Sequence, residues 1–372
     1  MARHDHIVAA MQRADELSLR GLGRTSPNPI VGAVLIDDQG VVISEGFHQR
    51  GNAEIPGKHA EIVALDGAGE RARGATLVVT LEPCNHQGKT PPCTEAIITS
   101  GVSRVVMSTP DPNSVASGGA VRLRKAGIEV ESGVLASQVA FTNRAWLHKI
   151  TQNRTFVTAK VAATIDGYIA AADGSSKWIT SQASRSDVSK LRSECDAIIT
   201  GTGTVLSDDP RLTVRGIDDS QSDFKQPLRI ILGKREIPQT ARIRSEEAPT
   251  YFLQTHDFRE LLDLTSRLDL NRVLLEAGST LVTAFIKAGL VDELFLYQAP
   301  TLLGSGRLMV GELGISTLSQ RMDFQVKEVA MIGEGEERNI RTHFLSQSTE
   351  NLLQNVDRKS TRLNSSHLVI SY

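Results

Sequence analysis

The sequence lacks the features that mark secreted, membrane-bound or nucleic-acid-binding proteins. Only three of its 372 residues are cysteine, an odd number and too few for a disulfide framework. No apolar run reaches the ~18 residues that a membrane helix needs, and the first 20 residues carry charges instead of a signal-peptide core. The formal net charge is -2, without a long run of lysine or arginine. These absences predict a cytoplasmic protein with no membrane or nucleic-acid partner.

The length favours two domains, because 372 residues exceed what one hydrophobic core usually holds. Runs of β-branched residues alternate with helical patterns over residues 1–147, which predicts a layered α/β domain. The polar stretch "HKITQNR" (148–154) is interpreted as a linker. A second α/β domain is predicted over residues 153–346. The remaining residues, 347–372, are predicted to be a tail that is disordered or non-native, since "DRKSTRLNSSHLVISY" is polar and aperiodic.

Two of the three cysteines lie in one short loop, and this loop follows a histidine. "HAEIVAL" begins at His59, and "LEPCNHQGKTPPC" contains Cys84 and Cys93. Zinc binds tetrahedrally to nitrogen and sulfur, and a catalytic site leaves one position open for water. Helix N-termini favour anionic sulfur, and Cys93 is expected to open a helix. His59, Cys84 and Cys93 are therefore predicted to hold one zinc ion per chain.

Glu61 follows His59 by two residues and is predicted to be the catalytic acid–base group. A carboxylate beside a zinc site can take a proton from water and deliver it to a leaving amine. The helix that starts near His59 is expected to turn Ile62, Val63 and Leu65 inward. Two alternatives to a catalytic zinc site remain. In the first, the cysteines are buried as small hydrophobic residues and bind no metal. In the second, His86 is the fourth protein ligand of a structural zinc.

H-A-E followed by P-C and a second cysteine resembles the signature of zinc-dependent cytidine-deaminase-like enzymes. The usual spacing between the cysteines is shorter than the eight intervening residues here. That longer loop, with "TSPNPIVGAV" and "GFHQRGN", is similar to the deaminase half of the bifunctional riboflavin-biosynthesis deaminase–reductases. The resemblance implies a three-layer cytidine-deaminase-like domain that removes the C2 amino group of a diaminopyrimidinone ribosyl phosphate.

The same resemblance implies substrate contacts by Asn28 and His48, and suggests Lys89 or the amides of its loop for the phosphate. Each has a simpler interpretation. Asn28 stands beside proline, a common turn pair, and His48 is also compatible with an exposed loop.

In the second half, two glycine-containing stretches follow predicted strands. "GTGTVL" lacks the third glycine of a Rossmann fingerprint. "LLEAGSTL" places Glu276 at a strand end, and Gly278, Ser279 and Thr280 at a helix N-terminus that suits an anion. An ordinary capped helix is the alternative.

"VAATIDGYIA", "SSKWITS" and "LLEAGSTLVTAFIKAGLVDELFLYQAP" resemble the reductase half of the same bifunctional family. This implies a dihydrofolate-reductase-like fold that uses NADPH to reduce a ribosyl group to ribityl. The implied cofactor contacts are Ala162, Trp178, Thr204, Asp208, Gly278, Ser279, Thr280, Leu281, Val282, Thr283 and Ala284. The implied substrate contacts are Ser176, Arg192, Leu212, Arg215 and Glu276.

Some of these residues have ordinary structural interpretations as well. Two arginines suit a phosphate, but Arg192 also fits a solvated helix and Arg215 a loop charge. Trp178 also fits a hydrophobic core. Two other classes of protein could share the zinc site. A nucleic-acid deaminase is expected to carry a basic groove, which this sequence does not indicate. A non-catalytic protein with a structural zinc would have no use for Glu61. The resemblance favours small-molecule ribosyl phosphate substrates and a homo-oligomer.

Overall fold

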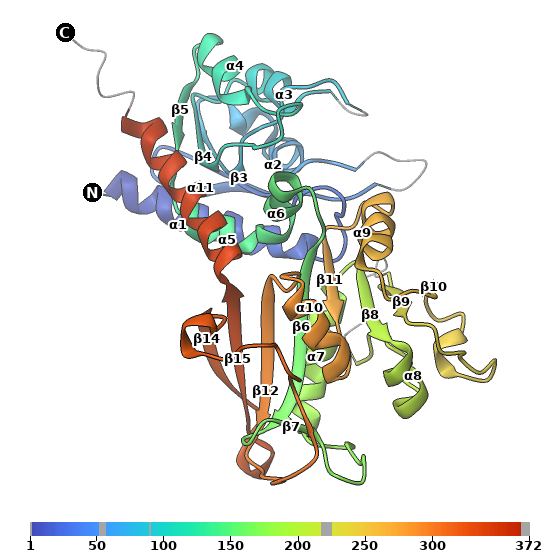
Figure 1. Cartoon of the computed structure of the whole chain (residues 1–372). Helices are drawn as coiled ribbons and strands as arrows, with labels where there is room; N and C mark the ends of the chain where they lie inside the picture. Colours follow the sequence, from blue (N-terminus) through green and yellow to red (C-terminus); the bar gives the residue numbers. More distant parts are fainter. Residues whose placement is uncertain (1, 52–56, 89–90, 217–224, 366–372) are drawn as a thin grey trace. The chain divides into compact units, whose positions relative to one another are not determined.

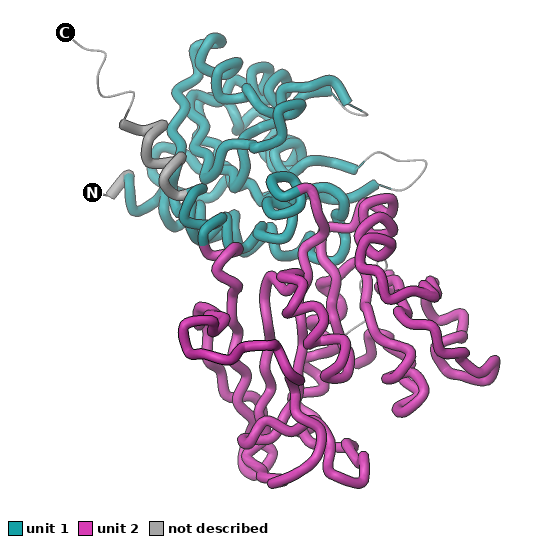
Figure 2. The backbone as a smooth tube through the Cα atoms, in the orientation of Figure 1, with its two compact units in different colours: residues 1–152, 351–372 teal, residues 153–350 magenta. Residues whose placement is uncertain are grey.

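The computed structural model describes residues 2–51, 57–88, 91–216 and 225–365. It divides the chain into two compact units (Figure 2). Unit 1 comprises residues 1–152 and 351–372, and unit 2 comprises residues 153–350. In the part of the chain that the structure describes, no helix is long and apolar enough to cross a membrane.

Unit 1 is built on a five-stranded sheet with the order β2-β1-β3-β4-β5 (Figure 1). β1 runs antiparallel to both of its neighbours, whereas β3, β4 and β5 are parallel. Its strands are β1 (Gly32–Ile36), β2 (Val42–Phe47), β3 (Thr76–Leu81), β4 (Arg104–Thr109) and β5 (Glu129–Ser132). Its helices before residue 153 are α1 (Ala2–Ser18), α2 (Ala60–Ala68), α3 (Cys93–Ser100), α4 (Gly119–Lys125), α5 (Ala136–Thr142) and α6 (Arg144–Gln152).

Helices cover both faces of this sheet, which gives the predicted three layers. On one face, side chains of α1 and α5 form one apolar cluster with β1, β3 and β4. A Cβ on Gly32 would lie 1.9 Å from the carbonyl oxygen of Ala14, so α1 approaches β1 more closely than a side chain would permit. On the other face, α2 packs closely on Gly46, where a Cβ would lie 2.3 Å from the oxygen of Ala60. The position of α2 matters because it carries Glu61 and because its N-cap residue is His59.

Unit 2 contains an eight-stranded sheet with the order β10-β9-β8-β11-β6-β12-β15-β14. The strands from β10 to β12 are parallel, and β15 and β14 add two antiparallel strands. The sheet strands are β6 (Phe156–Thr164), β8 (Ala197–Gly201), β9 (Leu228–Leu232), β10 (Thr250–Leu253), β11 (Arg272–Leu275), β12 (Glu293–Ala299), β14 (Phe324–Ile332) and β15 (Asn339–Ser346). A separate pair joins β7 (Tyr168–Ala170) to β13 (Arg307–Leu308).

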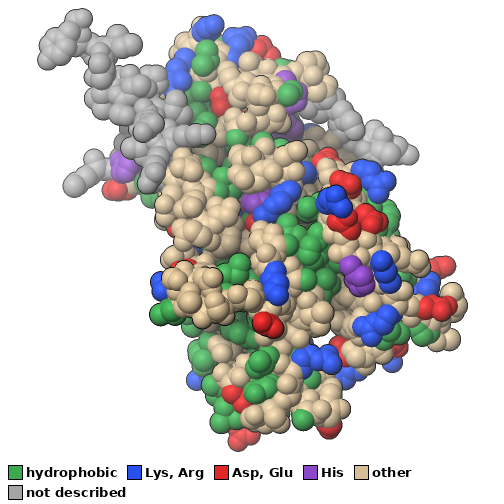
Figure 3. All heavy atoms as spheres, in the orientation of Figure 1, with side chains coloured by type: hydrophobic (Ala, Val, Ile, Leu, Met, Phe, Trp, Pro, Cys, Tyr) green, Lys and Arg blue, Asp and Glu red, His purple; other side chains and the backbone are tan. Residues whose placement is uncertain are grey.

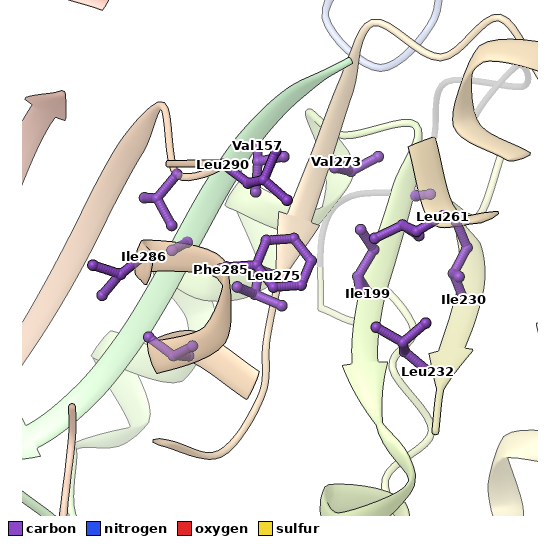
Figure 4. Close-up of a cluster of buried hydrophobic side chains, with 14 of the residues drawn as sticks. Val157, Ile199, Ile230, Leu232, Leu261, Val273, Leu275, Phe285, Ile286 and Leu290 are labelled. Atoms are coloured by element: carbon purple, nitrogen blue, oxygen red, sulfur yellow. The ribbon is translucent and has the colours of Figure 1, made fainter. Parts of the chain in front are cut away.

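Apolar clusters lie on both faces of this sheet. The larger one packs α9 (Phe258–Arg267) and α10 (Ser279–Lys287) on the strands, with Phe285 fully buried (Figure 4). The other packs α7 (Gln182–Ser193) and α8 (Thr202–Asp208) on the opposite face. In such a parallel sheet, the carboxyl ends of the strands form the usual ligand site.

Two expectations about the chain's organisation differ from the structure. The stretch 148–154, predicted as a linker, contains the end of α6, with His148 buried. Residues 347–365, predicted as part of a tail without regular structure, form α11 (Gln347–Ser365). Thr349 in its first turn is buried, and its hydroxyl donates to the backbone oxygen of Asp292 over 3.0 Å. Packing of this first turn, which a polar composition does not reveal, explains the second difference.

Candidate functional sites

The three predicted zinc ligands of unit 1 come together in the structure. His59 is the N-cap residue of α2, Cys93 is the first residue of α3, and Cys84 lies in the loop after β3. The Nδ1 atom of His59 lies 3.1 Å from the Sγ of Cys93 and 3.6 Å from the Sγ of Cys84. All three donor atoms lie within 4.8 Å of one another. One nitrogen and two sulfurs at this spacing fit zinc.

Two backbone hydrogen bonds join Cys84 to the first residues of α3. The backbone N–H of Cys93 donates to the Sγ of Cys84 over 3.4 Å, and the N–H of Thr94 donates to the oxygen of Cys84 over 3.3 Å. Hydrogen bonding by Cys93 lowers the pKa of the Cys84 thiol, which favours the anionic sulfur that a metal binds. His86 does not belong to the three-residue ligand cluster found among the described residues. The donor set therefore has the three protein ligands of a catalytic site.

Glu61 lies on the buried side of α2, and its side chain is 4% exposed. The predicted inward stripe was partly wrong, because Ile62 and Val63 are only half-buried. The buried stripe instead consists of Ala60, Glu61, Ala64, Leu65 and Ala68. Burial raises the pKa of the Glu61 carboxyl. The buried face of α2 therefore includes Glu61, and the N-cap of the same helix is the predicted zinc ligand His59.

His48 and Asn28 lie together beside the predicted zinc ligands. The Nδ2 atom of Asn28 is 3.3 Å from the Nε2 of His48, and the rings of His48 and His59 are 5.1 Å apart. His48 is 5% exposed and therefore is not an exposed loop histidine. Burial and the neighbouring His59 and Arg50 lower the pKa of His48 to about 4, so its ring is neutral near pH 7. Asn28 is exposed and also closes a turn through its backbone N–H to Thr25.

Glu82, which the motif analysis did not single out, organises the loops around this site. It is buried, and its carboxylate accepts the backbone N–H groups of Asp111 and Ala120 over 3.0 and 2.9 Å. The sequence could have identified Glu82 as a residue of the site, because it lies two residues before Cys84 in "LEPC". Lys89, suggested for the phosphate, lies outside the described residues.

We expect purified protein to hold one zinc per chain, and Cys93→Ala to reduce this to below about 0.1. Loss of one of three ligands weakens metal binding severely, because the remaining two cannot complete the coordination sphere. Metal analysis of the dialysed protein measures the content. Cys195→Ala is the matched control, since this buried thiol lies in unit 2. Equal zinc in all three proteins would contradict the site.

Unit 2 contains a cavity of about 2190 Å³ at the carboxyl ends of its strands. It collects most of the residues predicted to bind cofactor or substrate, from segments more than 100 residues apart. These are Ala162, Ser176, Trp178, Arg192, Thr204, Asp208, Leu212, Arg215, Glu276, Gly278, Ser279, Thr280, Leu281 and Ala284. The Oγ1 of Thr204 accepts the backbone N–H of Gly278 over 3.2 Å, which joins the two glycine-containing segments.

Two residues of the predicted cofactor run do not line this cavity. Val282 is 1% exposed in the apolar cluster beneath α10, and Thr283 is also buried. The hydroxyl of Thr283 donates to the oxygen of Ser279 over 2.6 Å and accepts the N–H of Gly311 over 2.7 Å. The helical period explains this difference, because a continuous run of residues cannot face one side of a helix.

A buried ion-pair cluster forms one wall of the cavity. Arg192 Nη2 lies 3.0 Å from Glu276 Oε2, and Lys160 Nζ lies 3.2 Å from the same oxygen. Burial opposes ionisation of Glu276, but the two cations outweigh it and lower the pKa of the carboxyl to about 2. Arg192 is therefore not a solvated helix residue. Lys160 was missed, although a single lysine in the apolar strand "TFVTAKVAAT" was a signal.

Trp178 and Arg215 are both exposed on the cavity wall. Trp178 is 71% exposed, so it does not belong to the hydrophobic core. The guanidinium of Arg185 lies 4.4 Å from the centre of its ring. Its exposed face is available to stack on a planar ligand. The backbone of Arg215 is fixed by Ser189, whose hydroxyl donates to its carbonyl oxygen over 2.6 Å.

The lowered pKa of Glu276 predicts a pH-dependent stability. The unfolded carboxyl titrates near its ordinary value of 4.5, so the stabilisation is complete above that pH and is lost as the pH falls towards 2. The stability of the native protein relative to Glu276→Gln should fall by on the order of 3 kcal/mol across this window. Urea unfolding followed by circular dichroism between pH 2.5 and 6 measures the difference. A constant difference would refute the ion-pair contribution.

Comparisons with known proteins cover both units. Residues 5–109 match the cytidine and deoxycytidylate deaminase zinc-binding region, and residues 155–336 match the RibD C-terminal domain. The riboflavin biosynthesis protein RibD of Mycobacterium tuberculosis is 47% identical over 328 residues, which cover 88% of this chain and 95% of that protein. RibD of Escherichia coli is 40% identical, with 87% of this chain and 96% of that protein covered.

Solved structures agree with these sequence matches. RibD of Acinetobacter baumannii superposes with a TM-score of 0.82 at 39% identity, covering 92% of this chain and 99% of that one. A diaminohydroxyphosphoribosylaminopyrimidine deaminase/5-amino-6-(5-phosphoribosylamino)uracil reductase of Thermotoga maritima also gives 0.82, at 35% identity and the same coverage.

Proposed function

This chain belongs to the RibD family of bifunctional riboflavin-biosynthesis enzymes, and we propose on that premise which substrates its two sites convert. It has a cytidine and deoxycytidylate deaminase zinc-binding region and a RibD C-terminal domain. Unit 1 deaminates 2,5-diamino-6-ribosylamino-4(3H)-pyrimidinone 5′-phosphate. Unit 2 then reduces 5-amino-6-(5-phosphoribosylamino)uracil with NADPH, converting its ribosyl group to ribityl. The observation that supports this proposal is that His59, Cys84 and Cys93 come together in unit 1, and that most of the predicted cofactor and substrate residues line one cavity in unit 2.

In the deaminase site, His59, Cys84 and Cys93 would hold the zinc. When bound, zinc lowers the pKa of water and makes it a nucleophile near pH 7. Glu61 takes one proton from that water and delivers it to the departing C2 amino group, so that water and the amine yield a carbonyl and ammonia. Neutral His48 and the amide of Asn28 provide hydrogen bonds for the polar ring atoms of the substrate.

In the reductase site, Gly278, Ser279 and Thr280 at the N-terminus of α10 would bind the cofactor's phosphates. NADPH supplies the hydride when bound. Arg192 and Arg215 attract the substrate phosphate. Glu276 orients Lys160 and Arg192 at the cavity wall, where the Nζ of Lys160 can donate a hydrogen bond to the sugar.

We also propose that the protein works as a homo-oligomer in the cytoplasm. The three cysteines are free thiols, which suits a reducing compartment. Two of them are the predicted zinc ligands Cys84 and Cys93, which bind the metal only in their reduced form.

A coupled assay tests the proposed function directly. The zinc-loaded protein is mixed with the diaminopyrimidinone ribosyl phosphate and NADPH, and ammonia and NADPH are followed in one tube. We expect one ammonia released for each NADPH oxidised, with ammonia appearing first. Omitting NADPH should leave ammonia release intact. Oxidation of NADPH without ammonia release would contradict the proposed order, and inactivity towards both would contradict the substrate.

A further inference from the structure

Arg229 of β9 is an arginine buried inside unit 2. Its exposed fraction is 0%, and it is the largest fully buried side chain in the described part of the chain. Figure 3 shows other lysine and arginine side chains at the surface on the side of unit 2 where β9 and β10 lie. An arginine is rarely buried completely unless its charge is paired. The groups around Arg229 must therefore compensate for the water that its guanidinium loses.

The guanidinium of Arg229 forms five hydrogen bonds, one for each of its N–H groups. Nε donates to the Oγ1 of Thr250 over 2.8 Å, and Nη1 donates to the backbone oxygen of Arg211 over 3.1 Å. Nη1 also donates to the Oγ of Ser245 over 3.3 Å, and Nη2 donates to the backbone oxygens of Ser245 and Ala248, each over 2.5 Å. None of these partners is a carboxylate, and burial lowers the pKa of the guanidinium. A buried charge adds little to stability by itself, so the directions of these bonds are what distinguish Arg229 from an apolar residue.

One of these bonds reaches a segment of the cavity wall, residues 209–215, which form neither helix nor strand. Two of its residues, Leu212 and Arg215, are implied substrate contacts, and both line the cavity. The φ angle is 43° at Asp209 and 51° at Leu212, in the left-handed region that costs conformational energy in residues other than glycine. Such a backbone persists only where the surrounding structure holds it.

Side chains from other parts of unit 2 hold the second half of this segment. Arg192 Nη1 donates to the backbone oxygen of Thr213 over 2.9 Å. The side chain of Gln226 accepts the backbone N–H of Val214 over 2.8 Å and donates to its carbonyl oxygen over 3.1 Å. The bond from Arg229 acts earlier in the segment, on the residue directly before Leu212. Together these contacts supply the support that the left-handed backbone requires.

We propose that Arg229 is a positioning residue of the reductase site, whose guanidinium fixes the backbone at Arg211 and thereby holds Leu212 and Arg215 where the ribosyl phosphate binds. The proposal rests on the reductase part of the proposed function, which assigns these two residues to the substrate. Arg229 is fully buried and is not part of the cavity lining, so it acts through the segment and not on the substrate itself. Its loss should therefore weaken substrate binding more than cofactor binding.

Steady-state oxidation of NADPH by the full chain tests this role. In Arg229→Met, which removes all five donors, the KM for 5-amino-6-(5-phosphoribosylamino)uracil should rise by about 10-fold or more, because hydrogen bonds from a charged group are lost. The KM for NADPH should stay near the native value, and kcat should change less than the KM for the uracil compound. Arg229→Lys keeps the charge and fewer donors, so its KM should lie between the two. Circular dichroism establishes that each variant is folded.

Two further variants separate this role from a general effect on unit 2. Arg244→Met is the matched control, because its guanidinium also donates to backbone oxygens, those of Ile237 and Pro238, but to residues outside the 209–215 segment. It should keep both native KM values. Gln226→Met removes the two bonds to Val214 and should raise the KM for the uracil compound alone. It gives the same comparison if Arg229→Met does not fold.

Hydrogen exchange followed by mass spectrometry shows where the structure of Arg229→Lys has loosened. Exchange should accelerate in peptides that cover residues 209–215 and stay native over β11 and α10. A native KM for the uracil compound in the folded Arg229 variants would refute the proposal. So would a parallel rise of both KM values, or accelerated exchange throughout unit 2, since Arg229 would then act on stability alone. A native protein that oxidises no NADPH with this substrate would refute the proposed function and this proposal together.

Discussion

Replacing Glu61 by glutamine should reduce ammonia release by about 100- to 10,000-fold while leaving NADPH oxidation with the deaminated substrate unchanged. Glutamine keeps the size of the side chain but cannot take a proton from water or pass one to the leaving amine. The buried position of Glu61 on α2 leaves little room for bulk water to replace it. Steady-state ammonia release and NADPH oxidation, measured on the same preparation, give the two values.

Two controls make this result specific. Glu70→Gln changes an exposed carboxylate just beyond α2 and should release ammonia at the native rate. Zinc content of Glu61→Gln should remain one per chain, because Glu61 is not among the three ligands. Native rates of ammonia release by the zinc-loaded variant would eliminate Glu61 as the proton carrier. Loss of zinc would show that it acts through the metal instead.

Replacing Glu276 by glutamine should give the opposite pattern, with NADPH oxidation reduced by about 100-fold and ammonia release retained. The neutral amide no longer balances Arg192 and Lys160, so the two cations lose their fixed orientation at the cavity wall. The effect should fall mainly on kcat, because the positioned charges act on the reacting sugar. Single-turnover oxidation of NADPH with saturating deaminated substrate measures it.

The controls for this variant lie in the same unit. Glu246→Gln removes an exposed carboxylate away from the cavity lining and should oxidise NADPH normally. Asp208→Asn changes a second carboxylate of the cavity lining, an implied cofactor contact whose side chain accepts a hydrogen bond from Ser207 over 2.8 Å. If Asp208→Asn abolished the reaction and Glu276→Gln did not, Asp208 and not Glu276 would be the carboxylate that the reduction requires.

The sequence predicted what depends on local spacing. His59, Cys84 and Cys93 were found because strand ends and helix starts in a layered domain bring such residues together. The two fold types and both activities were implied by the resemblance to a family, which several motifs in one order carry. The residues around Gly278 were predicted to bind an anion because a strand followed by glycine and a helix is a local pattern, and the structure places Gly278, Ser279 and Thr280 in the cavity lining.

What depends on packing was not predictable. Nothing near Lys160 in the sequence reveals that Glu276, more than 100 residues later, becomes its partner. The face of α2 was misjudged because Ile62 and Val63 are more hydrophobic than Ala60 and Ala64, whereas the structure buries the two alanines and leaves Ile62 and Val63 half-buried. Val282 and Thr283 were included among the predicted cofactor contacts because a continuous stretch of sequence does not show which of its residues face a ligand once it forms a helix.

The hydrogen bonds between Cys84 and the start of α3 have a consequence for the length of the segment between the two cysteines. Because these bonds tie Cys84 directly to the first turn of α3, the intervening residues are not needed to set the distance between the two sulfurs. We therefore expect a change in the number of these residues to leave the two sulfurs in place and the zinc content of the protein unaltered.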